Sequence, residues 1–289
     1  MSSKHKTTSK AVMAQQDLHR VLVALDASSY DDITLEVAAS LAYRLQAELE
    51  GLFVESADLF RLTELDAVHE IGFSSASRRL LDKDTLSRSM KMLAAHAQTQ
   101  LALLAQQYQL TCSFHITRGQ ILTKALALSQ GCDVMVVGTS GTLLGPGRQA
   151  VPSISTMVHQ SQCSLLLLQQ RAVLGASVMV LYDGSAQANV AAKLGAQLVR
   201  KQAGTLHIIL LADRTRSAEI ADQAKTAVGD AVSISFHQFD GSQISSLSAL
   251  LRKEGCGLLL VPATGLADVN AVIGLEQLIR LACPVLLVR

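Results

Sequence analysis

Residues 133–141 combine a strand-like run with a loop of small residues. The apolar run 134–137 leads directly into Gly138-Thr139-Ser140-Gly141. This pattern predicts a buried strand of a parallel sheet, followed by a loop between two glycines. Ligands of open α/β sheets bind beyond the carboxyl ends of the strands, so we expect any ligand chemistry at this loop.

Two aspartates end strand-like runs and are the candidate functional acids. Asp26 follows the apolar run 21–25, and Asp183 follows the similar run 178–182. Each carboxylate could bind a ligand, or it could cap the helix that follows, a role that Ser28 or Ser185 could share. The sequence leaves both alternatives open.

Several other kinds of site lack their motifs. No lysine follows a glycine, so the phosphate-binding P-loop is absent, and the first strand is not followed by the Gly-x-Gly-x-x-Gly of dinucleotide-binding folds. The loop 138–141 does not match the Gly-x-Ser-x-Gly nucleophile elbow. His69-Glu70 begins a zinc-protease motif, but Phe73 replaces its second histidine. The eight histidines show no ligand spacing, so we predict no metal site and no catalytic residues.

The residue periodicity predicts alternating strands and helices. A strand, an amphipathic helix and a second strand follow one another near the start, the pattern of a right-handed βαβ unit. Residues 56–84 interrupt the alternation with a short amphipathic helix. A long helix is expected over 84–108, with an apolar stripe that faces the core. The expected strands cover 20–26, 49–55, 112–117, 134–137 and 164–168, and the other helices cover 31–45, 121–129 and 153–160.

The second part of the sequence repeats the first. Residues 177–183 match the first strand at an offset of 157 residues. Two strands that follow a cysteine also recur. Cys132 corresponds to Cys256, at an offset of 124 residues, and Cys163 corresponds to Cys283, at an offset of 120. Two cysteines that recur in register are strong evidence of an internal duplication.

The duplication predicts two tandem domains. A disordered tail covers residues 1–18, domain 1 covers 19–169, a linker covers 170–176, and a shorter, more divergent domain 2 covers 177–289. The offsets place the extra chain of domain 1 mainly in the insertion 56–84. The linker is short and has no proline, so we expect the two domains to pack together.

The composition restricts the class of protein. The chain has 289 residues, of which 49% are hydrophobic and 17% charged, with a net charge of +1. This balance gives no reason to expect a nucleic acid or a membrane as a partner. Five cysteines without a Cys-x-x-Cys pair indicate a reducing compartment, and no apolar segment follows the lysines of the tail. We therefore predict a cytoplasmic protein.

Three motifs together resemble those of the universal stress protein family. They are Val-x-x-Asp-x-Ser ending at Ser28, Val-Val-Gly-x-x-Gly ending at Gly141, and Cys-Pro-Val-Leu-Leu-Val-Arg ending at Arg289. The resemblance implies a tandem member with two Rossmann-like domains of the adenine nucleotide alpha hydrolase-like class. Each domain would hold a five-stranded, mainly parallel α/β sheet of order 3-2-1-4-5, flanked by helices. It also implies dimerisation and roles in stress survival.

One branch of this family binds ATP or AMP, and the resemblance transfers part of that site to domain 1. In that branch an acid after the first strand contacts adenosine and a valine after the second strand binds the base, which correspond to Asp26 and Val54. Two glycines approach the phosphates, which correspond to Gly138 and Gly141. The branch then has nine residues and Gly-Ser or Gly-Thr, where this chain has Val151 and Pro152. Ser153 supplies a hydroxyl one residue late.

Domain 2 departs further from the nucleotide-binding pattern. Asp183 and Gly265 match it, but Pro262 replaces the first glycine, and Gly274 arrives one residue early and is followed by Leu275. We therefore predict a non-enzymatic stress-response or regulatory protein with degenerate nucleotide sites, which acts as a homodimer or internal pseudo-dimer and binds an unidentified protein partner. The alternative is an ATP or AMP binder with slow hydrolysis in domain 1, through Asp26, Gly138, Gly141 and Ser153.

Overall fold

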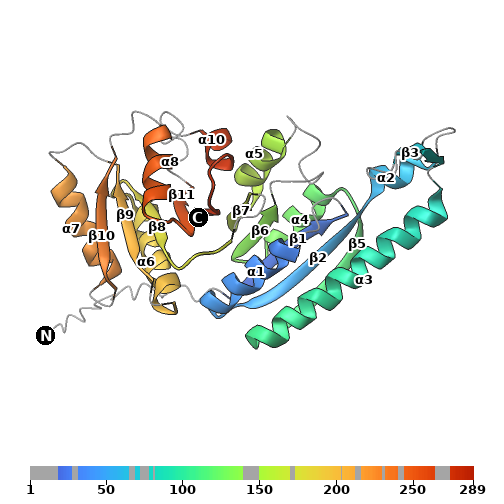
Figure 1. Ribbon diagram of the computed structural model, residues 1–289, viewed down its shortest axis with the longest axis horizontal. Helices are drawn as coiled ribbons and strands as arrows, with labels where there is room; N and C mark the ends of the chain where they lie inside the picture. Colours follow the sequence, from blue (N-terminus) through green and yellow to red (C-terminus); the bar gives the residue numbers. More distant parts are fainter. Residues whose placement is uncertain are drawn as a thin grey trace, which may run out of the picture.

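A ten-stranded sheet forms the centre of the protein, with helices on both of its faces (Figure 1). The structure is a computed structural model, and it describes residues 19–27, 32–64, 69–71, 78–80, 82–138, 150–169, 173–202, 204–211, 216–229, 232–239, 244–263 and 274–289. The predicted tail over 1–18 lies outside the described residues. The architecture confirms the predicted α/β class.

The first half of the chain supplies five strands of this sheet and four of its helices. The strands are β1 (Arg20–Asp26), β2 (Glu48–Ser56), β5 (Cys112–Gly119), β6 (Val134–Gly138) and β7 (Ser164–Leu168). The helices are α1 (Asp32–Leu45), α3 (Lys83–Tyr108), α4 (Ile121–Ser129) and α5 (Ala150–Gln160). β6 and β7 are buried along their whole length, as continuous apolar runs in a parallel sheet require.

The second half repeats this series of elements. Its strands are β8 (Val178–Tyr182), β9 (Leu206–Leu210), β10 (Ile234–Gln238), β11 (Leu258–Pro262) and β12 (Val285–Val288). Its helices are α6 (Ala186–Arg200), α7 (Ser217–Val228), α8 (Ile244–Lys253) and α10 (Leu275–Ile279). Each half therefore has the same alternation of strands and helices.

The strand order is the same in both halves. Across the sheet the strands run β10-β9-β8-β11-β12-β7-β6-β1-β2-β5. Each half on its own is a five-stranded sheet of order 3-2-1-4-5, and all neighbours within a half are parallel. The predicted topology of the two tandem sheets is thus confirmed.

The two half-sheets join through their fifth strands, β7 and β12, which run antiparallel. Leu166 lies opposite Leu286 in this pair, and the two leucines occupy the same position in the two repeats, 120 residues apart. A local two-fold axis therefore passes between them. Both side chains are fully buried, so the junction is part of the core.

The helices divide into two layers, one on each face of the sheet (Figure 1). Helices α1, α3, α6 and α7 cover one face, and α4, α5, α8 and α10 cover the other. Each layer crosses the junction, because α1 contacts α6 on the first face and α5 contacts α10 on the second. The two halves accordingly share two continuous apolar cores.

The segment before β8 fixes the second half against the first. The Arg44 guanidinium of α1 is 2% exposed and donates hydrogen bonds to the carbonyl oxygens of Gly175, at 2.7 Å, and Leu174, at 3.0 Å. Gly175 also lies against Gly257, where a Cβ on Gly175 would come within 2.8 Å of the Gly257 Cα atom. Only glycine permits this backbone approach.

The insertion differs from its predicted form. The short helix α2 covers only Ala57–Leu62, and Ser56 caps it by accepting a hydrogen bond from the Leu59 amide. It is followed by a small antiparallel pair, β3 (His69–Ile71) with β4 (Arg78–Leu80). The apolar spacing predicted a helix that continues to Ile71, but α2 ends at Leu62 and Ile71 lies in β3. Residues 65–68 lie outside the described residues.

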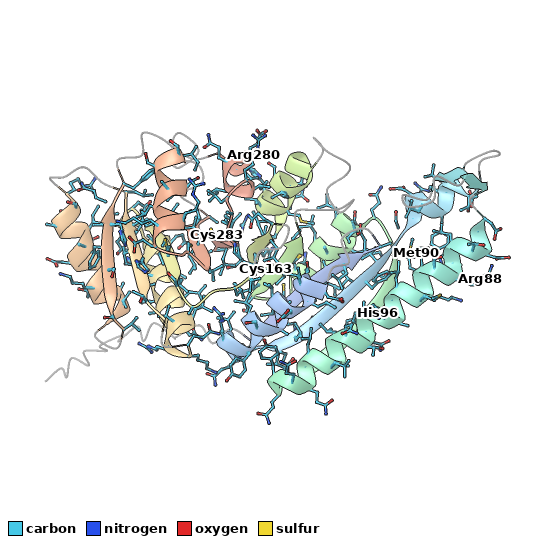
Figure 2. The ribbon with its side chains drawn as sticks, in the orientation of Figure 1. Arg88, Met90, His96, Cys163, Arg280 and Cys283 are labelled. Atoms are coloured by element: carbon cyan, nitrogen blue, oxygen red, sulfur yellow. The ribbon has the colours of Figure 1, made fainter. Side chains whose placement is uncertain are left out.

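Helix α3 confirms the prediction of a core-facing stripe. Its buried residues, such as Met90, Ala97 and Leu101, recur at helical spacing, while Arg88 and His96 are exposed (Figure 2). The helix begins after Asp82, whose carboxylate accepts a hydrogen bond from the Thr85 amide at 2.9 Å.

The duplicated cysteines lie at equivalent places in the two halves. Figure 2 shows Cys163 and Cys283 near the middle of the molecule; Cys163 directly precedes β7, and Cys283 lies two residues before the start of β12. Cys132 lies near Cys163, and Cys256 near Cys283; the neighbouring thiol and burial raise the pKa of the Cys132 and Cys256 thiols. All five cysteines are free, as the sequence predicts.

Candidate ligand site at the carboxyl edge of the first half

Three of the predicted ligand residues meet at one edge of the sheet. Asp26 is the last residue of β1 and pairs with Val54 of β2, and Gly138 is the last residue of the neighbouring strand β6. The Asp26 side chain is 4% exposed, and Val54 is fully buried. The topology therefore brings these positions together, as parallel strands must. Gly141 lies outside the described residues.

The backbone that should complete a phosphate site is helical. Helix α5 begins at Ala150, three residues earlier than predicted, so Val151, Pro152 and Ser153 all lie in its first turn. Proline is compatible with a first turn, where amides have no partner within the helix, but it removes one of the amides that could bind an anion. The Ser153 side chain is outside the described part of the chain.

A charged cluster that the sequence analysis missed lies beside these residues. Strand β2 continues past Val54, and Glu55 pairs in register with Arg118 of β5. The Arg118 Nε and Nη2 atoms donate to one Glu55 carboxylate oxygen at 3.0 and 2.8 Å. The guanidinium carbon lies 3.9 Å from the centre of the Phe60 ring of α2, a cation–π contact.

This cluster changes the electrostatics of the edge. The described side chains there include two buried carboxylates, Asp26 and Glu55, and the Arg118 guanidinium, which is already paired. Arg118 and Glu55 neutralise one another, so this guanidinium is not available to a phosphate group.

In the second half, Asp183 and Ser185 stabilise the start of helix α6. The Asp183 Oδ1 atom accepts a hydrogen bond from the Ser185 amide at 2.9 Å, and the Ser185 hydroxyl accepts one from the Ala188 amide at 3.1 Å. This is the capping alternative that the sequence left open. Pro262 ends β11 within the sheet, opposite Val288. Gly265 lies outside the described residues.

Tyr182 adds a further polar contact to this corner. Its hydroxyl donates a hydrogen bond to the Asn189 Oδ1 atom at 2.5 Å. Burial raises the pKa of Tyr182, and the nearby Asp183 carboxylate adds to this effect. Tyr182 therefore stays protonated at neutral pH and acts as a hydrogen-bond donor.

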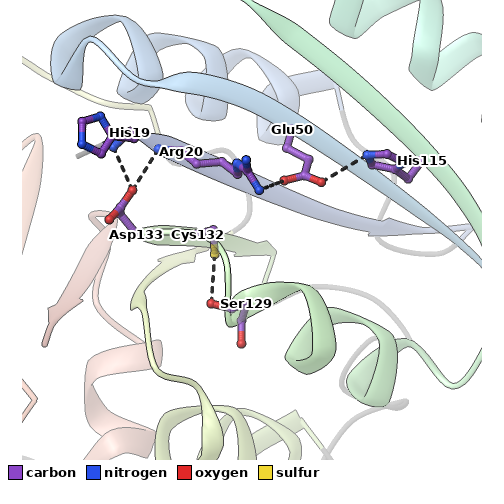
Figure 3. A network of polar contacts seen from close by, with 7 residues as sticks. All are labelled: His19, Arg20, Glu50, His115, Ser129, Cys132 and Asp133. Carbon is purple, nitrogen blue, oxygen red and sulfur yellow. Dashed lines mark hydrogen bonds and ion pairs between the residues drawn. The ribbon is translucent and has the colours of Figure 1, made fainter. Parts of the chain in front are cut away.

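The opposite, amino edge of the first half-sheet carries a polar network (Figure 3). The Asp133 carboxylate accepts hydrogen bonds from the His19 and Arg20 amides at 2.8 and 2.9 Å, which joins the starts of β1 and β6. Glu50, 6% exposed, lies between Arg20, at 3.6 Å, and the His115 Nε2 atom, at 3.2 Å. The first residue of the stretch 133–141 is thus structural.

One pair of histidines that lie far apart in the sequence meets in the structure. His207 of β9 and His237 of β10 are in direct contact, with 2.9 Å between the His207 Nδ1 and His237 Nε2 atoms. Sequence spacing does not indicate this contact, because the two residues are thirty positions apart and meet only through the pairing of their strands.

Comparison with known proteins identifies the fold. No protein-family model and no curated protein matches this sequence. A universal stress protein from Archaeoglobus fulgidus DSM 4304 has a similar structure, with a TM-score of 0.67 and 16% identity over 95% of this chain and 97% of the other.

Two proteins of Pseudomonas aeruginosa give weaker likenesses. One is a putative universal stress protein from strain UCBPP-PA14, with a TM-score of 0.54 and 14% identity over 94% of this chain and 93% of the other. The second is a functionally unknown protein from strain PAO1, with a TM-score of 0.55 and 13% identity over 94% and 92%. At this identity the matches establish the fold alone, and they confirm the resemblance to universal stress proteins at that level. None of the helices in the described ranges is both long and apolar enough to span a membrane.

Proposed function

We propose that this protein is a cytoplasmic, non-enzymatic regulatory protein of the universal stress protein type, with nucleotide sites that have lost their ligand. The observation that carries the proposal is the Glu55–Arg118–Phe60 cluster at the edge where a ligand would enter the first half. Glu55 directly follows Val54 on β2, and its carboxylate is engaged with Arg118 of β5 and is therefore not available to a ligand at this edge.

The phosphate side of the site supports the same proposal. Pro152 removes an amide from the first turn of α5, and the Arg118 guanidinium at this edge is already paired with Glu55. In the second half, Asp183 is engaged with the amide of Ser185. In the second half, a residue of the nucleotide-binding pattern is therefore used for a contact within the protein.

The alternative is an ATP or AMP binder that uses the first half. Asp26 and Gly138 support it, because they end neighbouring strands at the same edge of the sheet. The two candidates differ in what they predict for binding of a free nucleotide.

Calorimetric titration of the full chain with ATP and with AMP separates them. We expect no heat of binding at micromolar to tens-of-micromolar nucleotide for the wild-type protein. Micromolar binding that is abolished by Gly141→Val or Asp26→Asn, and unchanged by Asp183→Asn in the second half, would overturn the proposal and establish the alternative.

We further propose that the pairing of β7 with β12 makes the chain an internal pseudo-dimer. Leu166 and Leu286 face each other across a local two-fold axis, so this strand edge is already covered within one molecule. Light scattering should give a mass near 30.8 kDa. Twice that mass would show a homodimer formed through another surface, such as the edge strand β5 or β10.

The insertion is the surface that we propose for a protein partner. Helix α2 and the β3–β4 pair occur only in the first half, and Figure 1 shows α2 and β3 at the end of the molecule farthest from the second half. Cross-linking followed by mass spectrometry should place a bound protein on residues 56–84. Cross-links confined to the second half would contradict this assignment.

A further inference from the structure

A cluster of two histidines and a glutamate lies in the second half, away from the carboxyl edge. His207 lies near the start of β9, His237 lies on the neighbouring strand β10, and Glu254 follows the last residue of α8. One potential ligand atom of each residue lies within 4.8 Å of the other two. Among the residues that the structure describes, this is the one group of three or more such side chains close enough to share an ion.

The geometry of the two imidazoles is close to that of a metal-bound pair. The His207 Nδ1 and His237 Nε2 atoms face each other at 2.9 Å, and the ring centres are 5.1 Å apart. Two nitrogen ligands about 2.05 Å from a tetrahedral zinc ion lie about 3.3 Å apart. The two nitrogen atoms must therefore move apart by a few tenths of an ångström to admit the ion. A small rotation of either ring provides this movement.

The third ligand is anionic and adjustable. Glu254 has a side chain that is 25% exposed, and the only ion pair that the structure gives it is with Lys253, at 3.6 Å. The Lys253 side chain is 79% exposed, so this contact is weak and competes little with an ion. Rotation of the glutamate side chain can bring its carboxylate toward the imidazoles.

The first half has an equivalent pair of polar residues, which is completed by a cationic side chain of the protein. Glu50 is the counterpart of His207, because both lie at the same position of the repeat, 157 residues apart. His115 is the counterpart of His237, since the two face Leu52 and Ile209, which are themselves equivalent. The same two cross-strand positions thus carry a polar pair in both halves.

The pairs Glu50–His115 and His207–His237 differ in whether a positively charged side chain lies beside them. In the first half, the Arg20 guanidinium lies 3.6 Å from Glu50 and supplies the positive charge (Figure 3). Its counterpart in the second half is Ser177, an uncharged residue whose hydroxyl oxygen is buried without a hydrogen-bond partner. The second half therefore has a carboxylate and two imidazoles but lacks the guanidinium.

We propose that His207, His237 and Glu254 bind a divalent transition-metal ion. Two imidazoles and a carboxylate are ligands that suit Zn²⁺, with Cu²⁺, Ni²⁺ and Co²⁺ as competitors, and they do not suit Mg²⁺ or Ca²⁺. Three protein ligands leave the fourth tetrahedral position to water or another ligand, as in zinc sites that are not purely structural.

Metal binding requires a change of tautomer. A hydrogen bond between the two facing nitrogens requires a hydrogen on one of them, whereas a metal ion needs a lone pair from each. The ring that donates this hydrogen must carry it on its other nitrogen instead. Two neutral imidazoles can therefore bind the ion with no net release of protons.

The test is a calorimetric titration of the chelator-treated full chain with ZnCl₂. A second titration with CoCl₂ reports the visible absorption of tetrahedral Co²⁺. We expect one ion per chain, and we expect His237→Ala and Glu254→Gln each to weaken binding by about tenfold or more. His237 and Glu254 are only half-buried, so these variants should fold, which circular dichroism checks.

The repeat itself offers the matched control. His115→Ala removes the equivalent histidine of the first half and should leave Zn²⁺ affinity unchanged, and Cys112→Ser excludes binding at the exposed thiol. The proposal is overturned if no ion binds more tightly than millimolar, or if His237→Ala and Glu254→Gln bind as the wild type does. It is also overturned if only Cys112→Ser or His115→Ala weakens binding.

Discussion

Arg44 provides the most quantitative test of how the two halves are joined. Its side chain is 2% exposed, and it donates two hydrogen bonds, at 2.7 and 3.0 Å, to the carbonyls of the segment that leads into the second half. The Nε atom is buried without a partner, and burial lowers the pKa of the guanidinium. The residue therefore combines strong contacts with a large desolvation cost.

These two effects set the expected magnitude. Hydrogen bonds to a charged group contribute about 1.5–3 kcal/mol each to stability. Removal of the Arg44 guanidinium also leaves the carbonyls of Leu174 and Gly175 without the hydrogen bonds that it donates. The cost of burying the guanidinium, with one nitrogen unpaired, offsets part of this sum. We expect Arg44→Ala to lower the free energy of unfolding by about 2–4 kcal/mol. Arg44→Met, which keeps most of the apolar stem, should lower it by about 1–3 kcal/mol.

Urea unfolding followed by circular dichroism measures these changes. Lys201→Ala is the matched control, because Lys201 also joins the halves, through the carbonyl of Tyr43 at 3.4 Å, but it is exposed. We expect this control to change stability by less than about 0.5 kcal/mol. If Arg44→Met is as stable as the wild type, the two hydrogen bonds contribute nothing net and the reasoning fails.

Three further predictions concern the junction, a helix cap and the thiols. Leu166→Ala and Leu286→Ala should each lower the free energy of unfolding by about 2–5 kcal/mol, because both side chains are fully buried at the β7–β12 pair. Urea unfolding tests this prediction, and a loss below about 1 kcal/mol for both variants would contradict it. The hydrogen bond from the Thr85 amide lowers the pKa of Asp82 in the folded protein. The stabilisation by this carboxylate is therefore present at pH values above the unfolded pKa of about 4, and it is lost as the pH falls through the pKa of the folded state. Asp82→Ala should therefore melt earlier than the wild type at neutral pH and equally at pH 2, which thermal denaturation checks, and a pH-independent difference would refute the assignment. Iodoacetamide should modify the exposed Cys112 first and the buried Cys163 only after unfolding, as peptide mass spectrometry can show.

Much of the fold could be predicted because strands and helices follow local sequence periodicity. The apolar runs that end in Asp26 and Gly138 form strands, and the stripe on α3 faces the core. The duplication predicted two sheets of the same order, since each repeat carries the same series of elements. The insertion was predicted less well, because the β3–β4 pair is too short to give a clear alternation.

The candidate site could be predicted only in part. The edge position of Asp26, Val54 and Gly138 follows from strand order, and the sequence alone indicated that Val151 and Pro152 break the nucleotide-binding pattern. Whether Asp183 binds a ligand or caps a helix could not be decided locally. The structure shows its carboxylate bound to the Ser185 amide, because the turn after β8 brings that amide to it.

The contacts across strands were decided by the tertiary structure alone. The pairing of Glu55 with Arg118 and of His207 with His237 depends on the register of neighbouring strands, which joins residues far apart in the chain. A one-residue shift of register would turn each side chain to the other face of the sheet. Local periodicity therefore determined which residues form strands. Only strand pairing decided which charged and imidazole groups meet.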